Sequence, residues 1–136
     1  MNLRFLDRLQ PLGLLALRVV LGAIMIGHGY HKVFGGLSKH AGYVASIGMP
    51  HWLGYVSAFA EFGGGILLVA GLCTRCAAIA IFINMLVAII KVHLHQGLMG
   101  GYEYPLSLCA MAFALIFTGG GPISIDWVIG GGGTRK

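Results

Sequence analysis

Arg18 and Glu61 are each the one charged residue of an apolar run, at 11–27 and 53–72, and Asn84 is the polar residue of a third run, at 76–90. Ionisable residues inside such apolar runs often mark routes for protons or substrates through a membrane. A carboxylate held by an arginine beside an amide could bind a quinone head group or relay its proton. The alternative is a buried ion pair that only sets the register of two helices. These three residues are therefore the candidate interior site.

The heights of these residues along their predicted helices place them close together. Glu61 lies eleven residues before Leu72, and Asn84 lies nine after Arg75, so both are about 14–16 Å from one membrane edge. Arg18 lies about 10 Å in, and its long side chain can cover the remaining height. An unpaired charge at mid-bilayer costs at least about 2.5–3.5 kcal/mol. We therefore predict that Arg18 pairs with Glu61.

Histidines gather at the opposite end of the predicted helices. Neutral imidazoles beside a carboxylate suit proton transfer or a metal ion. However, the sequence has no H-E-x-x-H or comparable ligand spacing, so no metal is assigned. His40 and His51 are interpreted as residues of the membrane interface. The candidate outer cluster consists of His28, His31, His93, His95 and Glu103.

Cys73 and Cys76 have the C-x-x-C spacing of redox-active dithiols. No thioredoxin-like strand precedes them, and their predicted side of the membrane is reducing. Cysteine is also accepted as a small apolar residue at helix ends, and we favour that interpretation here. Cys109, within the last apolar run, is expected to pack between helices.

The elements that position these side chains follow from composition. Hydrophobic residues make up 57% of the chain and charged residues 10%, with a mean hydropathy of +0.86, which excludes a soluble or a disordered protein. A net charge of +5, scattered singly, argues against a nucleic-acid partner. Because about twenty helical residues cross a bilayer, we predict an all-α integral membrane four-helix bundle forming one domain over 1–136. Its helices are expected at about 11–32, 53–72, 75–94 and 104–120, with an interfacial segment at 1–10 and a flexible tail at 129–136.

Basic residues predict the orientation of the bundle. Four spans put both termini on one side of the membrane, together with the turn near Arg75. Five basic residues lie on that side and three on the other, which favours cytoplasmic termini in an inner-membrane, multi-pass protein. The five are Arg4, Arg8, Arg75, Arg135 and Lys136, and the three are Lys32, Lys39 and Lys91.

Several short segments stand out when they are taken together, at 17–22, 27–32, 60–65, 71–72, 74–75, 103–105 and 119–126. With these segments the chain resembles the DoxX family of small four-helix membrane proteins from about Leu15 to Asp126. The resemblance implies a bundle in which Arg18 and Glu61 are the signature polar residues of the first two helices. It also implies association with thiosulfate:quinone oxidoreductase-type subunits and with redox or detoxification systems. The Cys73/Cys76 pair departs from the usual family turn.

Three functional hypotheses remain open. The first is a membrane subunit or partner of a quinone-linked redox system, with lipid, a redox protein and a second copy of the chain as candidate partners. The second is a non-catalytic anchor or oligomerising scaffold. The third is a small transporter or metal-handling protein that uses the outer histidines. No motif requires a cofactor, and a quinone is the small molecule that the interior residues could bind. Whether the chain is an enzyme stays open.

Overall fold

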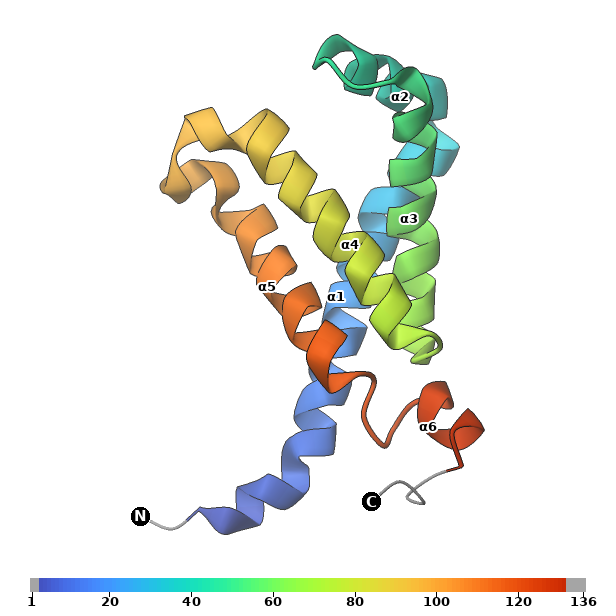
Figure 1. Cartoon of the computed structure of the whole chain (residues 1–136), viewed down its shortest axis with the longest axis vertical. Helices are drawn as coiled ribbons and strands as arrows, with labels where there is room; N and C mark the ends of the chain where they lie inside the picture. The colour runs from blue at the N-terminus through green and yellow to red at the C-terminus, as the bar shows by residue number, and fades with distance from the viewer. Residues whose placement is uncertain (1–2, 132–136) are drawn as a thin grey trace.

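The computed structural model describes residues 3–131, and every regular element in that range is a helix. Four helical stretches are long and apolar enough to cross a membrane, namely Arg4–Gly35, His51–Ala70, Thr74–Gln96 and Leu98–Thr118. The predicted fold class, an all-α integral membrane bundle, is therefore confirmed. The α-helices in Figure 1 are α1 (Gln10–Gly35), α2 (Leu37–Ser46), α3 (His51–Ala70), α4 (Thr74–Ala88), α5 (Glu103–Thr118) and α6 (Ile125–Ile129).

The ends of the chain differ in detail from the expected segments. The predicted interfacial segment is a 3-10 helix over Arg4–Leu9 that runs directly into α1, where Pro11 occupies the first turn. The short helix α6 lies where the sequence suggested only loop and tail. Of the predicted tail, residues 132–136 lie outside the part of the chain that the structure describes.

Close helix contact sets the register between α1 and α3, which are antiparallel neighbours. A Cβ built on Gly65 would lie 2.7 Å from the carbonyl oxygen of Gly22, so these two backbones approach as closely as glycine permits. A Cβ on Gly29 would likewise clash with the backbone of Phe62. Because bilayer lipid gives no hydrophobic drive for helix association, such contacts hold the pair together.

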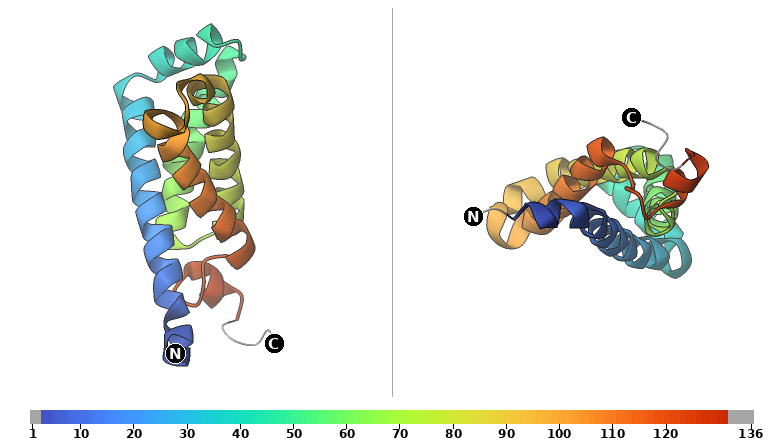
Figure 2. Two further views of the ribbon diagram at one scale, coloured as in Figure 1. Left: turned by 90° about the vertical axis from the view of Figure 1, so that its left-hand side faces the viewer. Right: turned by 90° about the horizontal axis from the view of Figure 1, so that it is seen from below.

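The outer loop contains the helix α2, which the sequence did not predict. Gly36, at a φ of 152°, ends α1 and lets the chain turn sharply into α2. The helix then lies across one end of the bundle (Figures 1 and 2). A Cβ on Gly54 would lie 2.5 Å from the Cα of Ala41, so α2 rests directly on the first turn of α3.

The third span changes its winding near this same end. After Ala88 the helix continues as a π-helix over Ile89–His93 and then as a 3-10 turn over Leu94–Gln96. The chain then bends at Met99 and Gly100, whose backbone angles are not helical, and leads into α5. π-turns are rare and often occur at functional sites, because they change the direction in which side chains point.

At the other end, the residues after α5 fold back onto the turn between α3 and α4. The side chain of Asp126 accepts hydrogen bonds from the backbone N–H groups of Cys73 and Thr74, at 2.7 and 2.8 Å. The N–H of Asp126 donates to the carbonyl of Gly71 at 2.9 Å. A residue more than fifty positions away in the sequence thus caps the N-terminus of α4.

Candidate functional site

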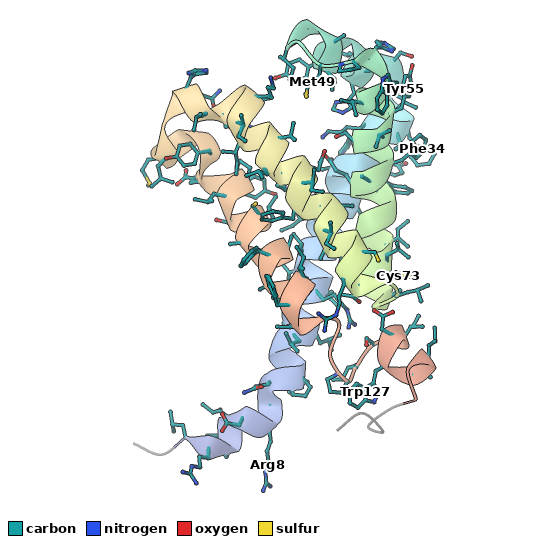
Figure 3. The ribbon with its side chains drawn as sticks, in the orientation of Figure 1. Arg8, Phe34, Met49, Tyr55, Cys73 and Trp127 are labelled. Atoms are coloured by element: carbon teal, nitrogen blue, oxygen red, sulfur yellow. The ribbon has the colours of Figure 1, made fainter. Side chains whose placement is uncertain are left out.

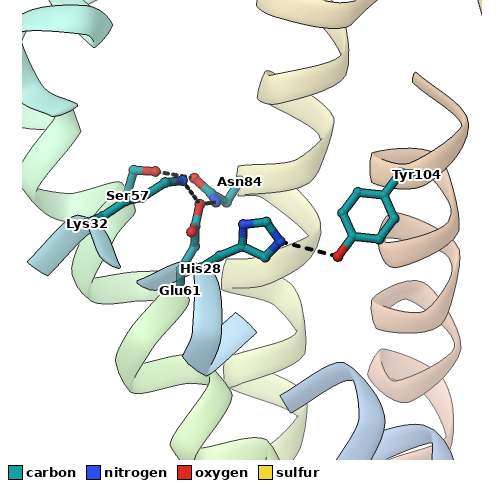
Figure 4. Close-up of polar contacts among 6 residues, drawn as sticks. All are labelled: His28, Lys32, Ser57, Glu61, Asn84 and Tyr104. Carbon is teal, nitrogen blue, oxygen red and sulfur yellow. Dashed lines mark hydrogen bonds and ion pairs between the residues drawn. The ribbon is translucent and has the colours of Figure 1, made fainter. Parts of the chain in front are cut away.

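Glu61 lies in the middle of α3 and is the centre of a polar network between three helices. Only 2% of Glu61 is exposed. One of its carboxylate oxygens, Oε1, accepts a hydrogen bond from Nζ of Lys32 on α1 and another from Nδ2 of Asn84 on α4, each 2.6 Å long. Figure 4 shows the two donors converging on that oxygen. The buried charge is therefore neutralised and hydrogen-bonded, as burial of a carboxylate requires.

Ser57 extends the network by one step. It lies one turn before Glu61 on α3, and its Oγ donates to Oδ1 of Asn84 at 2.6 Å (Figure 4). Residues four apart share a helix face, so α3 presents both groups to α4. Because the amide of Asn84 accepts on one side and donates on the other, its orientation is defined. The result is a continuous series of hydrogen bonds from Ser57 through Asn84 and Glu61 to Lys32.

The predicted pair of Arg18 with Glu61 is wrong. Arg18 is 2% exposed, and its guanidinium donates to the carbonyl of Gly120 at 2.7 Å, at the end of the bundle where Asp126 lies. A Cβ on Gly71 would lie 2.8 Å from Nη1 of Arg18. Arg18 is thus level with Gly71, ten residues along α3 from Glu61, or about 15 Å.

Lys32 takes the place that the sequence analysis gave to Arg18. With α1 antiparallel to α3 and Gly22 against Gly65, the residues after Gly29 on α1 come level with Glu61. Lys32 is 29% exposed, so its stem lies along the helix while its ammonium group reaches inward. The signal that could have identified it was its position fourteen residues beyond Arg18, near the opposite end of the same span.

A cavity of about 350 Å³ opens beside this network, under α2. Its polar side chains come from α1, α2, α3, α4 and the π-helix Ile89–His93. Three of the five residues of this π-helix line the cavity. A second cavity of about 280 Å³ is lined mainly by apolar residues of α3 and α4. The two cavities share the five residues Val44, Met49, Ser57, Asn84 and Val87. The polar residues of the first are Lys32, His40, Tyr43, Ser57, Asn84, Lys91 and His93.

His40 is the residue at this cavity that the sequence analysis undervalued. Its Nε2 is buried and has no hydrogen-bond partner among residues 3–131. Burial lowers the pKa of His40 from its usual value, the positive charge of Lys32 lowers it further, and Glu61 raises it in part. This shift favours the neutral imidazole. The interfacial interpretation missed it because α2, which buries this ring, was not predicted.

The predicted outer cluster does not converge. Within the described chain, no three of its histidines and carboxylates come together as metal ligands. Instead, Nε2 of His28 lies 3.2 Å from the Tyr104 hydroxyl (Figure 4), and Nδ1 of His93 lies 3.1 Å from Gln96. Oε1 of Glu103 accepts the N–H of Gly100. His31 and His95 are exposed, at separate places on this end.

Cys73 and Cys76 lie at the turn before α4, away from the Glu61 network, whereas Cys109 lies within α5. Cys73 and Cys76 are free and exposed, and Cys109 is free and buried. The Sγ of Cys109 lies 3.9 Å from the carbonyl oxygen of Phe82, on α4, in the packed interface between α4 and α5.

The sequence of this chain is similar to a known family and to a curated protein. The family model for DoxX matches residues 13–94, which include Lys32, Glu61 and Asn84. A Bacillus subtilis (strain 168) protein named "Putative oxidoreductase CatD" is 35% identical over 115 residues, which cover 85% of each chain. No solved structure matches the chain significantly.

Proposed function

Because this chain belongs to the DoxX family, we propose that it is the membrane subunit or partner of a quinone-linked redox system. The observation that carries the proposal is the pair of adjoining cavities, one polar and one apolar, which share the residues around Asn84. A quinone has the matching form, since a small ring with two carbonyl oxygens continues into a long apolar tail. Ligand sites are typically apolar cavities with a few placed polar groups.

The residues of the polar cavity fit a quinone ring. The Nε2 of His40 is a buried ring nitrogen without a partner among the described residues, and His40 is one of the residues that line the cavity. Neutral imidazole can donate a hydrogen bond from this nitrogen to a carbonyl oxygen. The ammonium group of Lys32 provides two further N–H donors after its bond to Glu61. These two donors would hold the head group, and the residues Val56, Ala60 and Ile83 would line the tail.

The network around Glu61 is suited to supplying protons. Reduction of a quinone to a quinol consumes two electrons and two protons, and we assign the electrons to a redox protein partner. Oε2 of Glu61 has no hydrogen-bond partner within 3–131, so the carboxylate retains the capacity to accept a proton. Lys32 bridges this carboxylate and the cavity. A proton passing between Glu61 and the head group therefore crosses a single ammonium group.

The name of the Bacillus subtilis relative supports a redox association, because it describes that protein as an oxidoreductase. We further propose that this chain lies in the inner membrane with cytoplasmic termini, as the basic residues predict. There it would have access to the quinone pool. Lipid and a second copy of the chain are the remaining proposed partners.

The proposal is tested by binding. We expect protein extracted gently from its native membrane to retain a quinone, detected by native mass spectrometry. The variant Ala60→Phe would fill the apolar cavity and weaken the binding of a decyl-substituted benzoquinone by at least about tenfold, since 1.4 kcal/mol of lost contact suffices. The matched control is Ala110→Phe, which places the same ring on the exposed face of α5.

Two outcomes would contradict the proposal. One is retention of lipid alone by the unaltered protein, which would favour the scaffold hypothesis. The other is equal quinone affinity in Ala60→Phe and Ala110→Phe, which would place any bound quinone outside these cavities. Both variants must first show the helical circular dichroism and thermal unfolding of a folded bundle.

A further inference from the structure

A third cavity, of about 470 Å³, lies at the opposite end of the molecule from the Glu61 network. It forms where the turn between α3 and α4, the end of α5 and the helix α6 meet. Figure 3 shows Cys73 and Trp127, two of its lining residues, at this end. Cys76 and Arg75 also line it, so both cysteines of the C-x-x-C segment line one cavity. Both thiols are free and exposed.

The backbone holds Cys73 in an unusual conformation. Its φ of 48° is the one positive value at a residue other than glycine in the described chain. The left-handed region costs a residue with a side chain about 1–2 kcal/mol relative to the right-handed region. The carboxylate of Asp126 offsets this cost, because it accepts the N–H groups of Cys73 and Thr74. Glycine would fit the turn without strain, so a cysteine here indicates a role for its thiol.

The spacing of the two cysteines permits a disulfide. Cys73 is the residue that precedes α4, and Cys76 follows three positions later in its first turn. Two cysteines with two residues between them at a helix N-terminus have the spacing of dithiols that close to a disulfide. Because Cys73 lies outside the helix, at an exposed turn, closure requires a change in that turn alone.

We propose that Cys73 and Cys76 form a redox-active dithiol that reacts with a low-molecular-weight disulfide bound in this cavity. One cysteine thiolate attacks a sulfur of the bound disulfide and releases one thiol. The other cysteine attacks the resulting mixed disulfide, releases the second thiol and closes the Cys73–Cys76 bond. The dithiol loses two electrons and two protons, and the bound disulfide gains them.

The charge at the cavity favours an anionic substrate. The guanidinium of Arg75 donates to the carbonyls of Ile116 and Phe117, at 2.7 and 3.0 Å, and these bonds fix it at the wall. The carboxylate of Asp126 is turned toward the backbone N–H groups of the α4 terminus. A disulfide that carries carboxylates, such as oxidised glutathione, is therefore the appropriate probe, with uncharged hydroxyethyl disulfide for comparison.

Intact-mass spectrometry of the full-length protein tests this proposal. After reaction with oxidised glutathione, the folded protein should lose two hydrogen atoms, about 2 Da. Only Cys109 should then remain open to alkylation after denaturation. The variant Cys76→Ser should instead hold glutathione as a stable mixed disulfide on Cys73. The variant Cys109→Ala is the matched control and should close its disulfide like the unaltered chain.

Two results would overturn the proposal. One is glutathione attached separately to Cys73 and Cys76 of the unaltered protein with no closed form. The other is closure that is no faster in the folded protein than in the denatured chain, since the turn would then contribute nothing. Because the measurement needs no quinone, it stands independently of the proposed function.

Discussion

At the scale of single residues, Glu61 and Lys32 form a pair of unequal burial. The carboxylate is 2% exposed and lies in the middle of α3, while the ammonium group belongs to a side chain that is 29% exposed near the end of α1. Asn84 adds a second hydrogen bond to the same carboxylate oxygen. Removing one partner of such a pair leaves the other charge unpaired, and the cost depends on whether that charge can reach water.

We predict that Lys32→Met destabilises the bundle more than Glu61→Gln. Loss of the lysine leaves a buried carboxylate without a cation, which costs about 3 kcal/mol or more in the free energy of unfolding. Loss of the carboxylate leaves a lysine that can extend to the interface, so the cost should be about 1 kcal/mol. Thermal unfolding in detergent measures both.

The double variant Lys32→Met/Glu61→Gln provides the control for this prediction. With both charges removed, it should recover part of the stability that Lys32→Met loses. Equal destabilisation by the two single variants would mean that the burial difference has no energetic consequence. If Glu61→Gln stays folded but lowers turnover of the parent complex, the proton role of Glu61 is supported.

At the scale of elements, glycines determine how closely α1 and α3 pack and therefore which side chains meet. Gly65 faces Gly22, and Gly63 of the same helix has no atom within 4 Å of a built Cβ. The two glycines are only two residues apart in α3, yet Gly65 is packed against α1 and Gly63 faces open space.

We predict that Gly65→Ala destabilises the bundle by about 1–3 kcal/mol, because its methyl group would press on the backbone of α1 at Gly22 and Ile26. The matched variant Gly63→Ala should leave the midpoint of thermal unfolding unchanged or slightly higher, since alanine favours helix over glycine. A tolerated Gly65→Ala would contradict the close approach and, with it, the register that brings Lys32 to Glu61.

At the scale of the whole molecule, hydrogen bonds at one end of the bundle connect α1, α3, α4, α5 and the residues after α5. Asp126 caps α4 and bonds to the end of α3, Arg75 reaches two carbonyls of α5, and Arg18 of α1 bonds to Gly120. Burial raises the pKa of Asp126, but the hydrogen bonds from Thr74 and Cys73 and the charge of Arg18 together lower it by more. The net pKa therefore lies below the usual value of 3.8. The folded protein thus favours the ionised carboxylate.

This shift predicts the sign of a pH effect. The stabilisation by Asp126 is complete above the usual carboxyl pKa of 3.8 and is lost as the pH falls through the lower pKa of the folded state. Asp126→Asn should cost about 1 kcal/mol at neutral pH, because the amide removes the charge and keeps one acceptor oxygen for the two N–H groups of Cys73 and Thr74. The difference in unfolding temperature between this variant and the unaltered protein should shrink from pH 6 to pH 3. A constant difference would show that the ionised form is not the stabilising one.

The spans and their helical character could be predicted because they depend on local sequence. A run of apolar residues in a bilayer has to satisfy its backbone hydrogen bonds internally, and Arg18, Glu61 and Asn84 stand out against such runs. The involvement of Glu61 and Asn84 in a common network follows from their equal height. All of this can be inferred without knowing how one helix is placed against another.

The partners of these residues depend instead on helix register and on segments that are distant in the sequence. Stripes of small residues on α1 and α3 permit several offsets, one turn apart, and the contact of Gly22 with Gly65 selects the offset that gives Glu61 to Lys32 and leaves Arg18 beside Gly120. Burial of His40 likewise requires α2 to lie across the bundle, and the cap of α4 comes from Asp126. No periodicity in a single helix encodes such contacts, because each is made by the packing of two separate segments.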